Sequence, residues 1–294
     1  MSNYSKNEGL LLLTPHLVPK VWGGQRFGKD IGEKWEISSL TQGPSLFNEI
    51  PLSEICSDLS YLVKYIDTTD NLSVQVHPTD EYAARVENQK GKTECWLILD
   101  AEPGAGIYLG LRPGVDKARL TKSIESGEDV SKLLNFIPVQ KGNFFVIPAG
   151  SIHAIGRGVY LAEVQQSSGL TYRVWDWNRG NRELHIKKAM DVIEFSPEKN
   201  SLEYFQFKED VLGSSAELYS HPDFTLGHYK WEQGKQKKLQ GHNRPIGIIC
   251  LEGSLEVSQK AQTQMIDKSH SLLINKKEAF LIKASASSHF LLVY

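Results

Sequence analysis

The sequence has few cysteines and no long apolar run, and each shortage argues against a class of protein. The 294 residues contain three cysteines, Cys56, Cys95 and Cys250, which are widely spaced and form no Cys-x-x-Cys pair. We therefore expect no disulfide framework, but reduced thiols in a cytoplasmic protein. No apolar stretch is long enough to span a bilayer, and the run at 10–13 is too short for a secretory signal peptide.

An excess of charge of one sign is also missing. Lysine and arginine number 33 and aspartate and glutamate 35, which gives a formal net charge of −2. This balance does not favour nucleic acid or an anionic membrane surface as a partner. The length suggests about two domains of ordinary size, with enough chain to bury a core. The sequence sets no oligomeric state.

Short segments rich in β-branched and aromatic residues recur along the chain, each bounded by Gly, Pro, Asp or Asn. They lie at 61–67, 72–77, 94–100, 106–111, 143–148, 158–166, 171–177, 245–258, 271–284 and 289–294. Helical spacing is found at 79–88 and 184–195, and as two short helices joined at Gly127 across 116–137. Many strands with few crossover helices predict a mostly β protein built as an antiparallel jelly-roll barrel with small helical insertions.

A polar stretch at 205–220 suggests a boundary between domain 1–208 and domain 209–294. When 276–289 is aligned with 141–153, Phe280 and Ile282 fall on Phe145 and Ile147. The glycines and the proline of the earlier segment have no counterpart in the later one. We therefore expect the second domain to be a degenerate β-barrel without a metal.

The segment 142–153 carries a spaced pattern of Gly142, Pro148, Gly150 and His153. Pro148 and Gly150 predict a tight turn that ends a strand, with His153 starting the next strand. The pattern fits the second sequence signature of the cupins, small jelly-roll barrels with a metal inside. A single histidine after a turn is also common as a structural or surface residue.

Further candidate ligands precede this motif. Gln75 and His77 alternate on one strand and so share a face, and Glu94 opens a later strand. Together with His153 they offer two imidazoles, a carboxylate and an amide, a set that suits a divalent transition ion, Zn²⁺ most readily. The alternative is that Gln75 and Glu94 are solvated residues on an outer strand face.

Four segments together resemble the short bacterial form of type I phosphomannose isomerase: "LSVQVHPTDEYA", "GKTECWLILDAEPGAGIYLGL", "FFVIPAGSIHAIGRGVYLAEVQQSSGLTYRVWDW" and "VWGG…FGKDIGEKWEIS". The resemblance runs from about residue 20 to about residue 195. It implies a zinc-dependent cupin enzyme that interconverts mannose 6-phosphate and fructose 6-phosphate. By this resemblance, the metal ligands for one ion are Gln75, His77, Glu94 and His153.

The resemblance also assigns roles to residues outside the ligand set. Lys92 falls on a lysine implicated in proton transfer, and Arg173 falls on the family's active-site arginine. Glu163 falls on an acidic residue proposed as a base, and Ser73 falls on a serine that lies near the substrate. Gly169 departs from the family, many of whose short members carry an acidic residue there that is linked to ring opening.

The chemistry of an aldose–ketose isomerisation asks for a base, a Lewis acid and a cation for the phosphate. Arg173 offers a planar fork for an anion, and alternation predicts that it shares a face with Trp175. Alternatively, Arg173 could form a structural salt bridge with Asp176 or Glu163. Lys92 could be a surface lysine, and Glu163 could simply pair with an arginine.

A second functional class remains open besides the isomerase. It is a metal-dependent cupin that binds a sugar phosphate without turning it over, as a sensor or a relic. Such a protein would need metal or phosphate contacts, but not Lys92 and Glu163 together. In both cases the expected partner is a small sugar phosphate.

Overall fold

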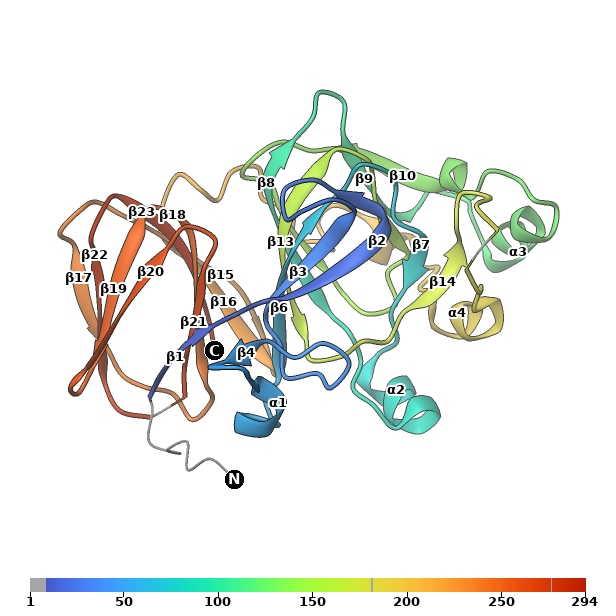
Figure 1. The fold of residues 1–294 in the computed structure, drawn as a ribbon. Coiled ribbons are helices and arrows are strands. Elements are labelled where there is room, and N and C mark those ends of the chain that lie inside the picture. Colours follow the sequence, from blue (N-terminus) through green and yellow to red (C-terminus); the bar gives the residue numbers. More distant parts are fainter. Residues whose placement is uncertain (1–8, 181, 276) are drawn as a thin grey trace. The chain divides into compact units, whose positions relative to one another are not determined.

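The computed structural model describes residues 9–180, 182–275 and 277–294 (Figure 1). The chain forms two compact units. We call residues 17–34 and 65–210 the central unit, and residues 9–16, 35–64 and 211–294 the C-terminal unit. One division between the units falls at 210/211, and the segment 35–64 belongs to the C-terminal unit.

The prediction of a mostly β protein is confirmed. The strands are β1 (Leu10–Leu13), β2 (His16–Gly24), β3 (Ile31–Ile37), β4 (Leu46–Phe47), β5 (Ile50–Pro51), β6 (Tyr61–Asp67), β7 (Val74–Val76), β8 (Glu94–Ala101), β9 (Gly106–Leu111), β10 (Leu134–Pro138), β11 (Phe144–Ile147), β12 (His153–Ile155), β13 (Val159–Gln166), β14 (Tyr172–Trp175), β15 (Ala216–His221), β16 (Phe224–Trp231), β17 (Gln236–Leu239), β18 (Ile246–Glu252), β19 (Ser254–Gln259), β20 (Gln262–Asp267), β21 (Ser271–Ile274), β22 (Phe280–Ala284) and β23 (Ser288–Val293). The helices are α1 (Leu52–Ile55), α2 (Asp80–Glu87), α3 (Lys117–Glu125) and α4 (Ile186–Val192), with 3₁₀ turns η1 (Val130–Leu133) and η2 (Pro197–Asn200). No helix within the described residues has both the length and the apolar character needed to cross a membrane.

The central unit contains a five-stranded sheet in the order β10-β9-β12-β7-β14 (Figure 1). Strands β8, β11 and β13 belong to a six-stranded sheet in the order β11-β8-β13-β6-β3-β2. Side chains of both sheets meet in one buried cluster, with Leu109 and Ile155 from the first sheet and Trp96, Phe145 and Leu161 from the second. The inner face of each sheet is thereby identified, because alternate residues of a strand share a face.

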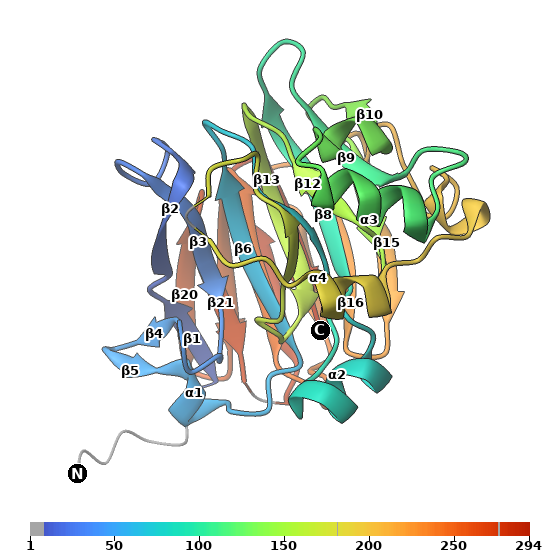
Figure 2. The ribbon, with the colours of Figure 1, turned by 90° about the vertical axis from the view of Figure 1, so that its right-hand side faces the viewer.

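The outer face of the five-stranded sheet is covered by α3 and α4 (Figure 2). Val74, Val76 and Ala154 of the sheet pack there against Leu120 of α3 and Ala189 of α4. Residues that alternate with Val74 and Val76 therefore face the other sheet.

Antiparallel pairing lines up three polar residues across the five-stranded sheet. His153 of β12 is opposite Gln75 of β7, and Gln75 is opposite Arg173 of β14. Directly opposed residues of neighbouring strands point to the same face. The register therefore brings His153, Gln75 and Arg173, which lie far apart in the sequence, into one row.

A tight turn joins β11 to β12, as predicted from Pro148 and Gly150. Gly150 has a φ of +90°, a conformation that L side chains rarely adopt, and its N–H donates to the carbonyl oxygen of His77 at 2.8 Å. The N–H of Glu194 donates in turn to the Gly150 oxygen at 2.9 Å. The turn is thus fixed both to the candidate ligand strand and to the segment after α4.

Glu194 offers a stability prediction at this turn. Its carboxylate accepts hydrogen bonds from the N–H of Ser196 and from Lys199 Nζ, each at 2.9 Å, and these bonds lower its pKa to about 2. Because this pKa lies below the ordinary 4.5, Glu194 stabilises the fold above about pH 4.5, and the contribution is lost as the pH falls toward 2. For this partly exposed group we expect Glu194→Gln to cost about 1 kcal/mol at pH 7. Urea unfolding at a series of pH values should show the difference shrinking in acid; a difference that stays constant with pH contradicts the assignment.

Two expectations about local structure are wrong. The second helix expected within 116–137 is the short 3₁₀ turn η1 followed by β10, because residues after Leu134 pair with β9. Trp175 does not share the face of Arg173: the register shifts between them, so that Trp175 pairs with Val74 and packs in the outer cluster. A bulge of this kind reverses the alternation of side chains.

The C-terminal unit has a six-stranded sheet in the order β1-β21-β18-β23-β16-β15 and a four-stranded sheet in the order β17-β22-β19-β20. Phe280 and Ile282 are buried in its core cluster, as Phe145 and Ile147 are in the central unit. A strand thus occupies each of the two aligned segments. The interpretation of this part as a degenerate, metal-free barrel stays a prediction.

Candidate metal centre

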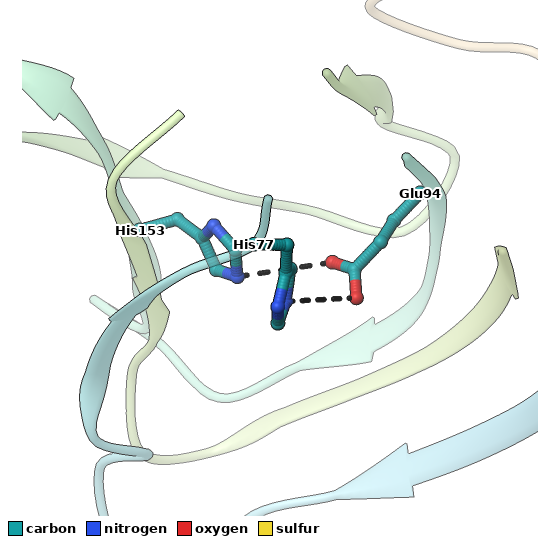
Figure 3. Close-up of side chains that lie close together, drawn as sticks. All are labelled: His77, Glu94 and His153. Carbon is teal, nitrogen blue, oxygen red and sulfur yellow. Dashed lines mark ion pairs between the residues drawn. The ribbon is translucent and has the colours of Figure 1, made fainter. Parts of the chain in front are cut away.

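Three of the four expected ligands come together in the central unit. His77 follows β7, Glu94 opens β8 and His153 opens β12, and one donor atom of each lies within 4.8 Å of the others. All three side chains are buried, and Figure 3 shows the Glu94 carboxylate facing both imidazole rings. Within the described residues, this is the group of His, Cys, Asp and Glu side chains that could hold a metal ion.

Backbone carbonyls orient both histidines. His77 Nδ1 lies 2.8 Å from the carbonyl oxygen of Leu170, and His153 Nδ1 lies 3.0 Å from that of Ser151. A carbonyl oxygen only accepts, so in each neutral ring Nδ1 carries the proton and Nε2 keeps its lone pair. A metal-binding imidazole usually donates its other ring N–H to an acceptor in this way.

The separations of the donor atoms fit a shared cation. Glu94 Oε1 lies 3.2 Å from His77 Nε2, and Glu94 Oε2 lies 3.8 Å from His153 Nε2. Two ligands at about 2.1 Å from a tetrahedral ion are about 3.4 Å apart, so the observed distances bracket the expected value. Glu94 is fully buried, and its Oε2 has no hydrogen-bond partner within the described residues. A buried acceptor of this kind is costly without a ligand.

A positive charge already lies among these donors. Lys92 Nζ is 2.9 Å from His77 Nε2 and also contacts Glu94 Oε1. Lys92 is 5% exposed, which rules out the alternative of a surface lysine. The solvated alternative for Glu94 is ruled out by its burial in the same way. The cluster therefore has the electrostatic character of a cation site.

Gln75, the fourth expected ligand, is half-buried beside the cluster. Its Nε2 lies 3.2 Å from His153 Nε2 and donates to it. Gln75 would have to turn its amide oxygen toward the cluster in order to bind a cation. It is therefore placed as a neighbour of the three-residue group.

Burial and neighbouring charges set the protonation of the cluster. Burial, reinforced by the Lys92 ammonium, lowers the pKa of His77 to about 3, so that His77 is neutral at physiological pH. Burial works against ionisation of Glu94, but Lys92 and His77 hold its pKa well below the usual range. A neutral imidazole and an ionised carboxylate are the forms of these two side chains that bind metal.

Glu163 lies on β13, the strand that pairs with β8 and its Glu94. It pairs with Trp96 across β13 and β8, and its Oε2 accepts a hydrogen bond from Trp96 Nε1 at 2.8 Å. The Trp96 ring packs edge-on against His153, with ring centroids 5.2 Å apart. Glu163 is thus connected to the cluster through an aromatic side chain, and its side chain is 2% exposed.

Arg173 lies next to Gln75 and is half-buried. Asp176 forms ion pairs with Arg179, at 2.7 Å, and with Arg182, and none with Arg173 among the described residues. Arg173 Nη1 donates to the carbonyl oxygen of Glu183, while Nε is buried without a partner in the described part of the chain. Burial and then the positive charge of Arg182 lower the pKa of Arg173. The salt bridge to Asp176 considered from the sequence is not found among the described residues, and Glu163 accepts a hydrogen bond from Trp96.

Ser73 is buried two residues before Gln75, at 3% exposure. The Ser73 hydroxyl is therefore not a solvent-facing group on an outer strand face. The side chains of Ser73, Gln75 and His77 alternate along the same segment with the outward-facing Val74 and Val76.

Gln165 and Gln166 are residues that sequence reasoning missed. Gln165 is opposite Glu94 across β13 and β8, is fully buried, and its Oε1 has no partner within the described residues. Gln166 accepts from the N–H of Thr93, next to Glu94. The signal available in the sequence was the spacing of two from Glu163 to Gln165, which puts both on one strand face.

Comparison with known proteins places the chain in a family. No family model matches it. The chain is 33% identical to the mannose-6-phosphate isomerase of Streptococcus mutans, over 90% of this chain and 92% of that protein. It is 35% identical to mannose-6-phosphate isomerase ManA of Bacillus subtilis, over 83% and 85% of the two chains. The crystal structure of the mannose 6-phosphate isomerase from Bacillus subtilis superimposes with a TM-score of 0.81 at 25% identity, covering 98% of this chain and all of that one. With its buried His–Glu–His cluster and a fold shared over nearly its whole length, the chain belongs to the mannose-6-phosphate isomerase family.

Proposed function

We propose that the protein interconverts mannose 6-phosphate and fructose 6-phosphate through an enediol, using one Zn²⁺ ion. The observation that carries this proposal is the buried group of His77, Glu94 and His153 with the Lys92 amine beside it. Family membership supports the substrate, because the relatives are named mannose-6-phosphate isomerases.

The donor set favours zinc as the ion. His77, Glu94 and His153 would hold it, with Gln75 as a fourth ligand after rotation of its amide. Two imidazoles, a carboxylate and one amide oxygen are all ligands that zinc accepts, and an ion that expands to five-coordinate would still have room for substrate. When bound, such an ion supplies Lewis-acid polarisation of the oxygens on C1 and C2.

Glu163 and Lys92 are our candidates for moving protons. The reaction removes the proton on C2 of the aldose and delivers a proton to C1, while a proton also moves from the C2 oxygen to the C1 oxygen. We assign the transfer between the carbons to the Glu163 carboxylate, which Trp96 orients. Lys92, a compact donor among the ligands, would serve the oxygen atoms.

Arg173 and Ser73 are our candidates for holding the substrate. Arg173 has a buried Nε that can still donate, and its guanidinium suits a phosphate or an enediolate oxygen. Ser73 offers a buried hydroxyl on the segment that carries Gln75. We also propose a cytoplasmic location, since all three cysteines are free and buried.

The test is a coupled assay in which purified, zinc-loaded protein receives mannose 6-phosphate and the release of fructose 6-phosphate is followed. We expect turnover, together with exchange of the C2 hydrogen with deuterated solvent. Saturable binding of mannose 6-phosphate without turnover or exchange would instead identify a sugar-phosphate-binding protein.

A further inference from the structure

The segment between α2 and β8 carries Lys92, and two side chains from distant parts of the chain hold it. Gln166 Nε2 donates to Asp80 Oδ1 at 3.0 Å and to Oδ2 at 3.2 Å. Asp80 is the first residue of α2, and Gln166 is the last residue of β13. The hydrogen bonds therefore join the start of the helix to the end of the strand, across 86 residues of sequence.

Gln166 fixes the backbone on the C-terminal side of Lys92. Its Oε1 accepts from the N–H of Thr93 at 2.8 Å, and its own N–H donates to the Thr93 carbonyl oxygen at 3.1 Å. Both backbone groups of Thr93 are thus satisfied by one residue, and Gln166 is 1% exposed. Thr93 is the residue between Lys92 and the candidate ligand Glu94, so its position sets the position of both.

Asp80 fixes the backbone on the N-terminal side of Lys92. Its Oδ1 accepts from the N–H of Gly91 at 2.8 Å. Gly91 lies so close to the helix that an added Cβ would be 2.5 Å from the backbone nitrogen of Asp80. The carbonyl oxygen of Pro78 also accepts from the N–H of Lys92 at 3.1 Å. Lys92 is therefore held on both sides by groups that meet in the Asp80–Gln166 pair.

We propose that Asp80 and Gln166 are a positioning pair that sets the placement of Lys92 and Glu94, and through them the affinity for Zn²⁺ and the rate of turnover. The turnover part rests on the proposed function, whereas the affinity part does not. A shift of about 1 Å in a reacting group can cost about 10²-fold in rate, and loss of a supporting hydrogen bond around a metal site typically costs 10–100-fold in metal affinity or activity.

The chemistry of the pair allows an exchange test. In Gln166→Glu, a carboxylate would face the Asp80 carboxylate, and the donor between them would be lost. In the double variant Asp80→Asn/Gln166→Glu, the Asn amide nitrogen can donate to the new carboxylate. The Asn oxygen can still accept from Gly91, and the new carboxylate can still accept from Thr93. The double variant therefore restores the same hydrogen bonds with the donor and acceptor exchanged.

The experiment measures Zn²⁺ affinity by competition with a chelating dye, and kcat and KM by the coupled assay. For Gln166→Glu we expect Zn²⁺ affinity and kcat to fall about 10–100-fold, with KM changed less than about threefold. For the double variant we expect both to return to within about fivefold of the wild type. If Zn²⁺ affinity and kcat fall equally in the single and the double variant, the proposal is overturned, because restoring the hydrogen bonds between positions 80 and 166 would then have no effect.

A second variant, at the exposed residue Asp80, keeps the test possible if Gln166→Glu does not fold. Asp80→Ala removes the carboxylate at an exposed site, and Glu81→Ala is the matched control, because Glu81 lies in the same first turn of α2 and is also exposed. We expect Asp80→Ala to weaken Zn²⁺ binding about three- to tenfold and Glu81→Ala to leave it unchanged. Identical Zn²⁺ affinities for the two variants would overturn the proposal.

A wild-type protein that binds Zn²⁺ without turnover would refute the proposed function. The measurements of Zn²⁺ affinity in the variants would still test the positioning pair.

Discussion

Replacing His153 by alanine is expected to abolish stoichiometric Zn²⁺ binding and to lower kcat/KM by about 10³ or more. His153 supplies one of the three buried donors that lie within 4.8 Å of each other. Its removal leaves Glu94 Oε2 without the imidazole that faces it. Lewis-acid stabilisation is worth several kcal/mol, which corresponds to about three powers of ten in rate. Metal analysis of the purified variant and the coupled assay measure the two effects.

Removal of the ion from the wild-type protein should have the same consequence. Treatment with a chelator is expected to abolish turnover, and added Zn²⁺ is expected to restore it. For the His153→Ala variant, His270→Ala is a suitable control, because His270 is an exposed histidine of the C-terminal unit whose Nδ1 faces a backbone oxygen. If His153→Ala kept one Zn²⁺ per chain and near-normal activity, the metal centre would be wrongly assigned.

Replacing Arg173 by alanine is expected to lower kcat/KM by about 10²–10³, while Zn²⁺ content stays unchanged. The buried Nε of Arg173 has no partner among the described residues, and a lost donor to a developing or bound anion has an effect of this size elsewhere. Arg173→Lys should recover little of the loss, because a lysine ammonium lacks the planar fork. Steady-state kinetics on mannose 6-phosphate and metal analysis are the measurements.

Arg119→Ala is the matched control for loss of an arginine charge. Arg119 forms an exposed ion pair with Glu128 at 2.8 Å, and such pairs contribute little. We expect its kcat/KM to equal that of the wild type. Near-normal turnover of Arg173→Ala would mean that Arg173 is structural and that the substrate site has been misplaced.

Local patterns in the sequence were sufficient to single out candidate metal ligands. Alternation along a strand puts Gln75 and His77 on one face, and Pro148 with Gly150 predicts the turn before His153. These features depend on residues close together in the chain, whose geometry is fixed by the backbone. The short runs of β-branched and aromatic residues gave the mostly β class for the same reason, and segments such as 61–67 and 106–111 match β6 and β9 residue for residue.

Pairing between distant strands decided what local pattern could not. Residues 116–137 were expected to be helical to their end, but 134–138 form β10 because β9 offers backbone partners. The bulge after Arg173 turned Trp175 to the outer face, since one extra residue in a strand reverses the alternation of side chains. Neither outcome can be read from a strand considered alone.

The sequence by itself determined which side chains are candidate metal ligands and which of them share a strand face. Only the tertiary structure decided that His153 is opposite Gln75, that Lys92 lies among the ligands, and that Asp80 meets Gln166. The physical reason is that strand register and hydrogen bonds across many residues depend on the packing of the whole sheet, whereas side-chain alternation depends on the backbone of a few neighbouring residues.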